Sequence, residues 1–120
     1  MKKLLIILIT ALISFTGISQ SATFKGDDTG MRKSLLDGVF EIELPGDVLS
    51  EDVEKHAGYY TSYFSVDFDA TTNIAKIIMV ENTPSARRVI NRFLLSNGVK
   101  EIDYDGKKHT LNDFYSTYLK

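Results

Sequence analysis

The hydrophobic pattern of this chain changes period several times, and each change marks an expected element. Residues 39–44 and 64–68 carry apolar side chains at every second position, which is typical of half-buried β-strands. Residues 74–80 are apolar on both faces apart from Lys76, as expected of a strand in the middle of a sheet. The pattern therefore predicts three strands in the first two thirds of the chain.

Helical spacing of apolar side chains is found in two stretches between or after these strands. The first predicted helix follows Ser50, a favourable N-cap residue. The second begins at Thr83 and Pro84, because threonine caps well and proline is tolerated at the first helical position. The arginines of the second helix lie off its apolar stripe and are predicted to face solvent: Arg87, Arg88 and Arg92.

The C-terminal part adds a strand, a hairpin and a short helix. Residues 99–104 form a predicted strand, and Asp105-Gly106 is a strong two-residue hairpin signal before a short return strand. Thr110 then caps a last helix. The order indicates an α+β fold of the ferredoxin-like, split β-α-β-β-α-β type with an extra C-terminal hairpin and short helix. We assign residues 37–120 to this domain and expect both main helices on one side of an antiparallel sheet.

The N-terminus predicts export. Lys2 and Lys3 precede an apolar run over residues 4–13, and this run of about ten residues is too short for a membrane span of roughly twenty. Two small residues occupy the usual positions before a cleavage site at Gln20: Gly17 and Ser19. Residues 1–19 are therefore predicted to be a signal peptide. We expect a periplasmic or extracellular protein without stable membrane insertion after cleavage.

The segment after the predicted cleavage site is polar and glycine-bearing. Residues 20–36 are interpreted as a flexible leader. Its glycines and Lys33 imitate a phosphate-binding loop, but the lysine does not directly follow the second glycine, as that motif requires. No phosphate site is predicted there.

Composition removes several classes of function. The chain has 120 residues and no cysteine, which excludes disulfides, thiol redox chemistry and thiolate metal sites. It has 14 Lys and Arg against 16 Asp and Glu, and loss of Lys2 and Lys3 leaves 12 against 16. This acidic balance disfavours nucleic acid as a partner. Because no catalytic motif is present, we predict no enzyme activity and no cofactor.

The central part of the chain resembles the heavy-metal-associated domain family. The resemblance covers residues 39–104, with "FEIELPG" as the first strand and "NGVKEIDYDG" as the entry to the last. That family binds soft metals through a CxxC motif between its first strand and first helix. At the matching place this chain reads "PGDVLSED", so no ligand residue carries over. The resemblance implies the scaffold without its metal transport.

We expect a small non-catalytic binding or interaction module whose partner is a protein of the cell envelope. Aromatic side chains with polar tips are common interface anchors, and three such residues share one side of the first helix at spacings of three and four: His56, Tyr59 and Tyr63. Strand alternation places a charged set on the sheet face opposite the helices: Glu41, Glu43, Asp67 and Lys76, joined by Glu101 and Asp103. Both sets also fit plain structural roles, covering the core edge and keeping an open sheet soluble.

The alternative is a periplasmic sensor or carrier of a hard cation or a small ligand. Its candidate ligands are acidic: Asp47, Glu51 and Asp52, or Glu101, Asp103 and Asp105. The second set imitates the start of a calcium loop, but Asn112 stands where the closing carboxylate is required. His56 and His109 are predicted to be surface residues, because a zinc site needs three or four protein ligands. The sequence gives no oligomeric state.

Overall fold

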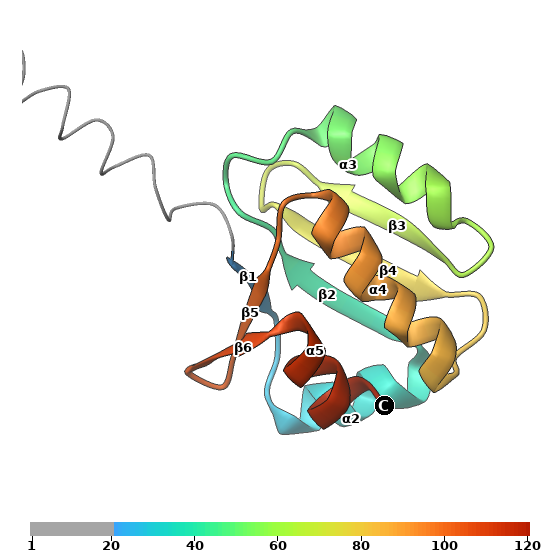
Figure 1. The fold of residues 1–120 in the computed structure, drawn as a ribbon, viewed down its shortest axis with the longest axis vertical. Coiled ribbons are helices and arrows are strands. Elements are labelled where there is room, and N and C mark those ends of the chain that lie inside the picture. The colour runs from blue at the N-terminus through green and yellow to red at the C-terminus, as the bar shows by residue number, and fades with distance from the viewer. Residues whose placement is uncertain (1–20) are drawn as a thin grey trace, which may run out of the picture.

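The computed structural model describes residues 21–120, so the predicted signal peptide lies outside the described residues. The fold is mixed α+β, with a six-stranded sheet and four α-helices in this part of the chain (Figure 1). The strands are β1 (Ser21–Phe24), β2 (Val39–Glu43), β3 (Phe64–Asp69), β4 (Ile74–Met79), β5 (Glu101–Tyr104) and β6 (Lys107–Thr110). The helices are α2 (Asp28–Asp37), α3 (Ser50–Ala57), α4 (Pro84–Ser96) and α5 (Leu111–Phe114).

Two short turns extend the helices. A 3₁₀ turn (Gly58–Tyr60) follows α3, and a π-helical turn (Tyr115–Leu119) follows α5. No helix between residues 21 and 120 is long and apolar enough to cross a membrane.

The strand order is β3-β4-β2-β1-β5-β6, which differs from the predicted plan in one respect. β1 lies between β2 and β5, antiparallel to β2 and parallel to β5. In the ferredoxin-like plan, β2 and β5 would be neighbours and the sheet would be antiparallel. The prediction of a fully antiparallel sheet is therefore wrong, and the ferredoxin-like topology is not confirmed.

The predicted flexible leader is replaced in the structure by β1 and α2. Ala22 and Phe24 alternate into the core and are only 1% and 3% exposed. Asp27 caps α2 by accepting a hydrogen bond from the backbone N–H of Gly30 at 2.8 Å. Gly38 ends α2 with φ of 72°, a conformation that favours glycine. The expectation missed these elements because two alternating apolar residues give almost no periodic signal.

Of the cap and turn residues predicted further along the chain, some are confirmed and one is wrong. Thr83 caps α4 by accepting from the backbone N–H of Ala86 at 3.2 Å, as predicted. Asp105 and Gly106 both have positive φ, 53° and 73°, as the predicted hairpin turn requires. The Ser50 cap is wrong, because the structure places Leu49 at the N-cap of α3 without a side-chain hydrogen bond.

One face of the sheet carries the helices and the core. Figure 1 shows α4 crossing in front of the sheet, α3 on its β3 side, α5 next to β6 and α2 at the lower end. Large aromatic residues from strands and helices meet between the layers and are fully buried: Phe40, Phe64, Phe93 and Phe114. The charged side chains of the opposite face are exposed or half-buried.

Arg87 departs from the prediction of a solvent-exposed arginine face. It is only 8% exposed, and its Nε donates to the Leu119 carbonyl at 2.6 Å. Another guanidinium nitrogen donates to Asn82 Oδ1 at 2.7 Å, while Asn82 Nδ2 donates to the Leu35 carbonyl at 2.6 Å. This chain of hydrogen bonds joins α2, α4 and the C-terminal turn. Arg88 and Arg92 are exposed, as predicted.

Candidate functional site

A hollow of about 360 Å³ lies between the start of α3 and the C-terminal end of α4. We call it the α3–α4 groove. The loop between β2 and α3 forms one wall through Asp47, Val48 and Leu49. In the heavy-metal-associated family, the metal ligands lie in the corresponding loop. The resemblance of this chain to that family stays a prediction. The remaining lining residues come from both helices and the turn after α4: Asp52, His56, Ser96, Asn97, Gly98 and Lys100.

His56 is held in one orientation by Asn97. Its Nδ1 lies 2.8 Å from Asn97 Oδ1, and Asn97 Nδ2 donates to the Phe93 carbonyl at 2.9 Å. A carbonyl can only accept, so the amide atom facing Phe93 must be the nitrogen. Asn97 Oδ1 therefore faces His56, and Nδ1 must carry the proton. In the neutral imidazole Nε2 is then the acceptor, and no hydrogen bond engages it within residues 21–120.

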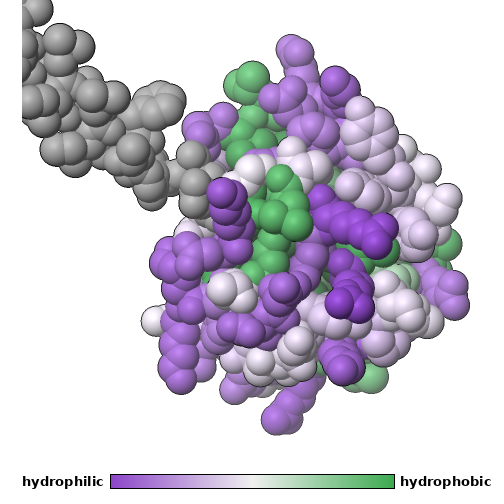
Figure 2. Space-filling view, in the orientation of Figure 1, coloured by the Kyte–Doolittle hydropathy of each residue, from purple (hydrophilic) through white to green (hydrophobic). Residues whose placement is uncertain are grey.

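The groove combines both charges with an apolar rim. Asp47 and Asp52 bring carboxylates, and Lys100 brings an ammonium group. Leu49 at the rim is 62% exposed. Figure 2 shows that apolar surface in the middle of this face is surrounded by polar side chains. Such a site suits a partner that presents both a polar and an apolar group.

The groove does not assemble an activated nucleophile. Ser96 is the hydroxyl residue beside His56, but its Oγ donates to the Phe93 carbonyl at 2.7 Å. Within residues 21–120, no hydrogen bond joins Ser96 to His56. A serine needs an adjacent general base to become nucleophilic, and here the Ser96 hydroxyl is engaged with its own helix instead.

The groove also lacks a set of metal ligands. Among residues 21–120, no group of three or more His, Cys, Asp or Glu side chains is placed to hold a metal ion. Asp47, Asp52 and His56 share the groove without converging on one point in this way, and Glu51 does not line it.

The predicted aromatic set is only partly brought together. The rings of His56 and Tyr59 lie 6.3 Å apart, and Tyr59 is 65% exposed beside the groove. Tyr63 follows the 3₁₀ turn and lines a separate hollow of about 550 Å³ with Val89 and Arg92 of α4. Helical spacing does not extend to Tyr63 because α3 ends at Ala57 and its 3₁₀ continuation ends at Tyr60.

The charged sheet face has the arrangement that strand alternation predicts. Lys76 of β4 is the register partner of Asp67 on one side and of Glu41 on the other. Exposed ion pairs join Lys25 to Glu43 at 3.2 Å and Lys108 to Asp103 at 3.4 Å. Such exposed pairs contribute about 0 to 1 kcal/mol each, so they fit a solubilising role.

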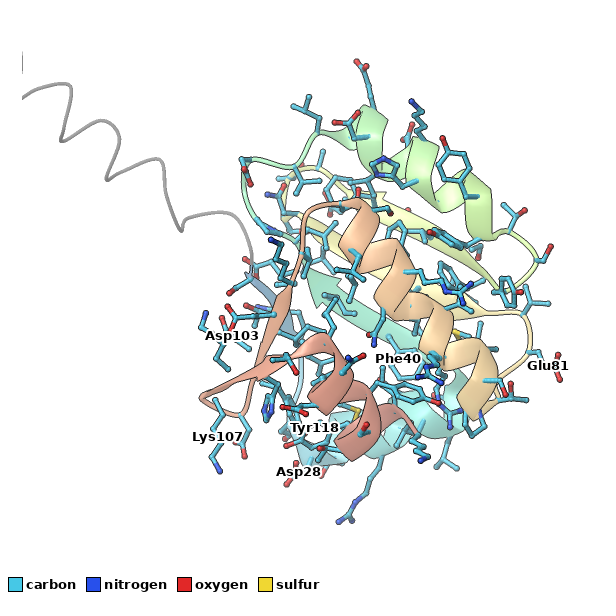
Figure 3. The ribbon with its side chains drawn as sticks, in the orientation of Figure 1. Asp28, Phe40, Glu81, Asp103, Lys107 and Tyr118 are labelled. Atoms are coloured by element: carbon cyan, nitrogen blue, oxygen red, sulfur yellow. The ribbon has the colours of Figure 1, made fainter. Side chains whose placement is uncertain are left out.

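The imitation of a calcium loop is a β-hairpin. Glu101 and Asp103 lie on β5, while Asp105 is in the turn to β6. Figure 3 shows Asp103 and Lys107 on this hairpin, at the edge of the molecule. Asp103 forms an ion pair with Lys108, and the three carboxylates do not form a cation cage.

His109 is half-buried, contrary to its predicted place on the surface. Its ring lies 5.5 Å from the ring of Tyr118 and 6.2 Å from that of Phe114. Its Nε2 is buried and has no hydrogen-bond partner among the described residues. His109 therefore belongs to an aromatic cluster.

The same aromatic cluster contains Tyr104, whose hydroxyl donates to Asp28 Oδ1 at 2.7 Å. Burial raises the pKa of the Tyr104 phenol well above its ordinary range, and the Asp28 carboxylate raises it further. Figure 3 shows Asp28 and Tyr118 at the same end of the molecule. This bond ties α2 to β5.

Sequence reasoning found His56, Asp47 and Asp52 but missed Asn97, Ser96 and Lys100. The missed residues lie at the end of α4 and in the segment that follows it, and only tertiary packing brings this part of the chain beside α3. Comparison of the chain with protein-family models, with curated proteins and with solved structures found no match. The groove residues themselves therefore carry the functional proposal.

Proposed function

We propose that this protein is a small exported, non-catalytic binding module of the cell envelope that holds a segment of a protein partner in the α3–α4 groove. The observation that carries the proposal is the His56–Asn97 pair. It fixes the imidazole of His56, through Nδ1, in the lining of a groove that also offers carboxylates and the apolar side chain of Leu49. A fixed acceptor costs little side-chain entropy on binding.

The groove chemistry defines the partner segment. His56 Nε2 accepts a hydrogen bond, so the partner supplies an N–H or O–H donor. Asp47 and Asp52 favour a positive charge on the partner. Leu49 in the groove lining and Tyr59, whose ring lies 6.3 Å from that of His56, offer apolar contact. A segment with a basic residue next to an apolar residue fits all three features.

Photo-crosslinking in the producing cell tests this site. A photoreactive phenylalanine at position 59 should yield a covalent adduct with the partner, because Tyr59 stands exposed beside the groove. Position 63 is the matched control, since Tyr63 lines a different hollow. The adduct at position 59 should disappear when His56→Ala and Asp52→Asn are added. Equal adducts from both positions, or an adduct that survives those changes, would reject the groove as the binding site.

Export is supported by the basic and apolar pattern of residues 1–19. Mass spectrometry of the native protein should find an N-terminus within about three residues of Gln20. Protein that retains Met1 in the cytoplasm would reject this part of the proposal.

We also propose that β2, α3, β3, β4, α4 and β5 form a ferredoxin-like unit to which β1 and α2 have been added. The element order supports this, and so does the antiparallel relation of β2 to β5 that follows from their pairing with β1. A variant without residues 20–37 could then pair β2 with β5 directly. Its circular dichroism should retain mixed α and β signals, and an unfolded variant would count against the unit.

The cation-carrier alternative has no supporting observation of this kind. Within residues 21–120, no group of three ligating side chains is placed for a metal. The alternative predicts that a chelator lowers the melting temperature by several degrees, because a metal bound only to the folded state would stabilise it. The binding-module proposal predicts no change.

A further inference from the structure

The two edge strands of the sheet, β6 and β3, differ in length and in lysine content. β6 has four residues and begins with Lys107 and Lys108, and short strands with lysine are protected against pairing with other chains. β3 has six residues, pairs with β4 in regular register throughout, and contains neither lysine nor proline. Of the two edge strands, β3 is therefore the one that can pair more readily with a strand from another chain.

The outer backbone groups of Val66 and Phe68 in β3 are available for hydrogen bonds, whereas Phe64 is fully buried. The backbone N–H of Val80 donates to the Tyr63 carbonyl at 2.9 Å, which makes these two residues a hydrogen-bonded pair. Such pairs alternate along an antiparallel ladder, so Ser65, Asp67 and Asp69 direct their backbone groups toward β4. The residues between them direct their N–H and C=O groups away from the sheet: Phe64, Val66 and Phe68.

An apolar shelf lies along this edge on the helix-covered side. Val66 and Phe68 are half-buried and pack against the core, as do Ala57 at the end of α3 and Tyr60 in the 3₁₀ turn after it. A strand added beside β3 would place every second side chain against this shelf and extend the apolar layer.

On the opposite side the edge is acidic and hollowed. Asp67 and Asp69 of β3 line a hollow of about 300 Å³ together with Glu41 and Lys76. Three carboxylates thus surround one ammonium group. A lysine or arginine side chain from an added strand would reach this hollow with its charge among carboxylates.

We propose that the free edge of β3 binds an extended segment of a partner protein that alternates lysine or arginine with apolar residues. The segment joins the sheet as a seventh strand. Backbone hydrogen bonds to Val66 and Phe68 provide affinity. The alternation provides specificity, because basic side chains face Asp67 and Asp69 while apolar ones face the shelf. This surface is separate from the α3–α4 groove and does not depend on it.

A synthetic peptide tests the edge. The probe has eight residues alternating lysine with valine or phenylalanine and blocked ends, and it is titrated into ¹⁵N-labelled protein. The backbone amides of Val66 and Phe68 should shift and become protected from hydrogen exchange. A peptide of the same composition with all lysines first should bind at least about tenfold more weakly, because it cannot satisfy both faces at once.

Two matched variants, each with two negative charges removed, distinguish a local effect at β3 from a general effect of net charge. Asp67→Asn with Asp69→Asn should weaken the alternating peptide by about tenfold or more. Glu101→Gln with Asp103→Asn removes the same charge from the same sheet face at β5, and should leave the affinity within about twofold. Both variants change only exposed or half-buried side chains, so folding is expected to persist.

Backbone pairing has its own test. The Val66 N–H points outward, so Val66→Pro removes a docking donor without removing a β3–β4 hydrogen bond. It should abolish peptide binding. Should this variant fail to fold, a peptide with N-methyl groups on its edge-facing amides replaces it and should not bind. The proposal is overturned if the block-order peptide binds as tightly as the alternating one. Shifts confined to residues away from β3 would overturn it as well.

Discussion

The two histidines of the chain stand in opposite surroundings. His56 has its Nδ1 bonded to Asn97 and its ring at the side of an open groove, next to an exposed tyrosine. His109 has its ring beside Phe114 and Tyr118, and its Nε2 is buried without a partner among the described residues. Both are half-buried, so burial alone does not distinguish them.

The two histidines differ in whether the groups around them contact each other or can contact a ligand. Around His109, the aromatic rings and the Tyr104–Asp28 bond are engaged with each other and hold α2, β5 and the C-terminal turn together. Around His56, carboxylates, an ammonium group and an imidazole nitrogen remain open to a ligand. We therefore expect changes near His109 to alter stability and changes near His56 to alter binding.

The largest effect is expected for Phe114→Ala. Phe114 is fully buried and contacts Phe24, Tyr104 and Tyr118, so its loss leaves a cavity at the C-terminal cluster. The free energy of unfolding should fall by about 3 to 5 kcal/mol. Urea denaturation measures it, with Leu49→Ala at the groove rim as the control that should change stability little. Comparable losses at both positions would remove the distinction between the two regions.

The next largest effect is expected for Arg87→Ala. This change leaves the buried Leu119 carbonyl without its donor and also removes the bond to Asn82 Oδ1, which should cost about 2 to 4 kcal/mol in total. Arg88→Ala is the matched control on the same helix, where an exposed guanidinium lies 5.5 Å from the Tyr115 ring. The control should cost less than about 1 kcal/mol. Equal losses would show that the Arg87 network carries no special weight.

Tyr104→Phe should cost about 1 kcal/mol near neutral pH, because it removes the hydrogen bond to Asp28. The pKa of this phenol is raised in the folded state, so its stabilisation is complete below the ordinary tyrosine pKa of about 10. It is lost as pH rises above that value, since the unfolded chain ionises first. The stability difference between the wild type and the variant should therefore shrink from pH 8 to pH 11. A constant difference across this range would contradict the raised pKa.

The smallest effects are expected from the histidines themselves. His109→Leu removes a buried nitrogen that has no partner, so stability should change by less than about 1 kcal/mol and could rise. His56→Leu loses one hydrogen bond to Asn97 and should cost about 1 kcal/mol. Only the His56 variant should lose the crosslinked partner. If His109→Leu also abolishes crosslinking, the assignment of binding to one region is wrong.

Much of the fold was predictable because its signals are local. The strands from residue 39 onward, the Thr83-Pro84 helix start and the Asp105-Gly106 turn depend on neighbours in sequence. β1 was not predictable, because it has only two alternating apolar residues and is defined by its pairing with the distant strands β2 and β5. The same holds for the site. The spacing of His56 and Tyr59 was visible, but Asn97 reaches His56 only through the packing of α3 against α4.

The position of β1 has a consequence for how this protein folds. The register partners Ser21 and Glu101 stand eighty positions apart, and in the sheet formed by residues 21–120 β1 links β3-β4-β2 to β5-β6. Contacts between such distant residues slow folding, because a large loop must close before they give any stability. A chain still emerging from the ribosome can form the β2-β4-β3 half early, while one side of β1 stays open until β5 has been synthesised. Completion of the sheet is thus a late, chain-length-dependent step, and it limits how soon this protein can resist unfolding or proteolysis.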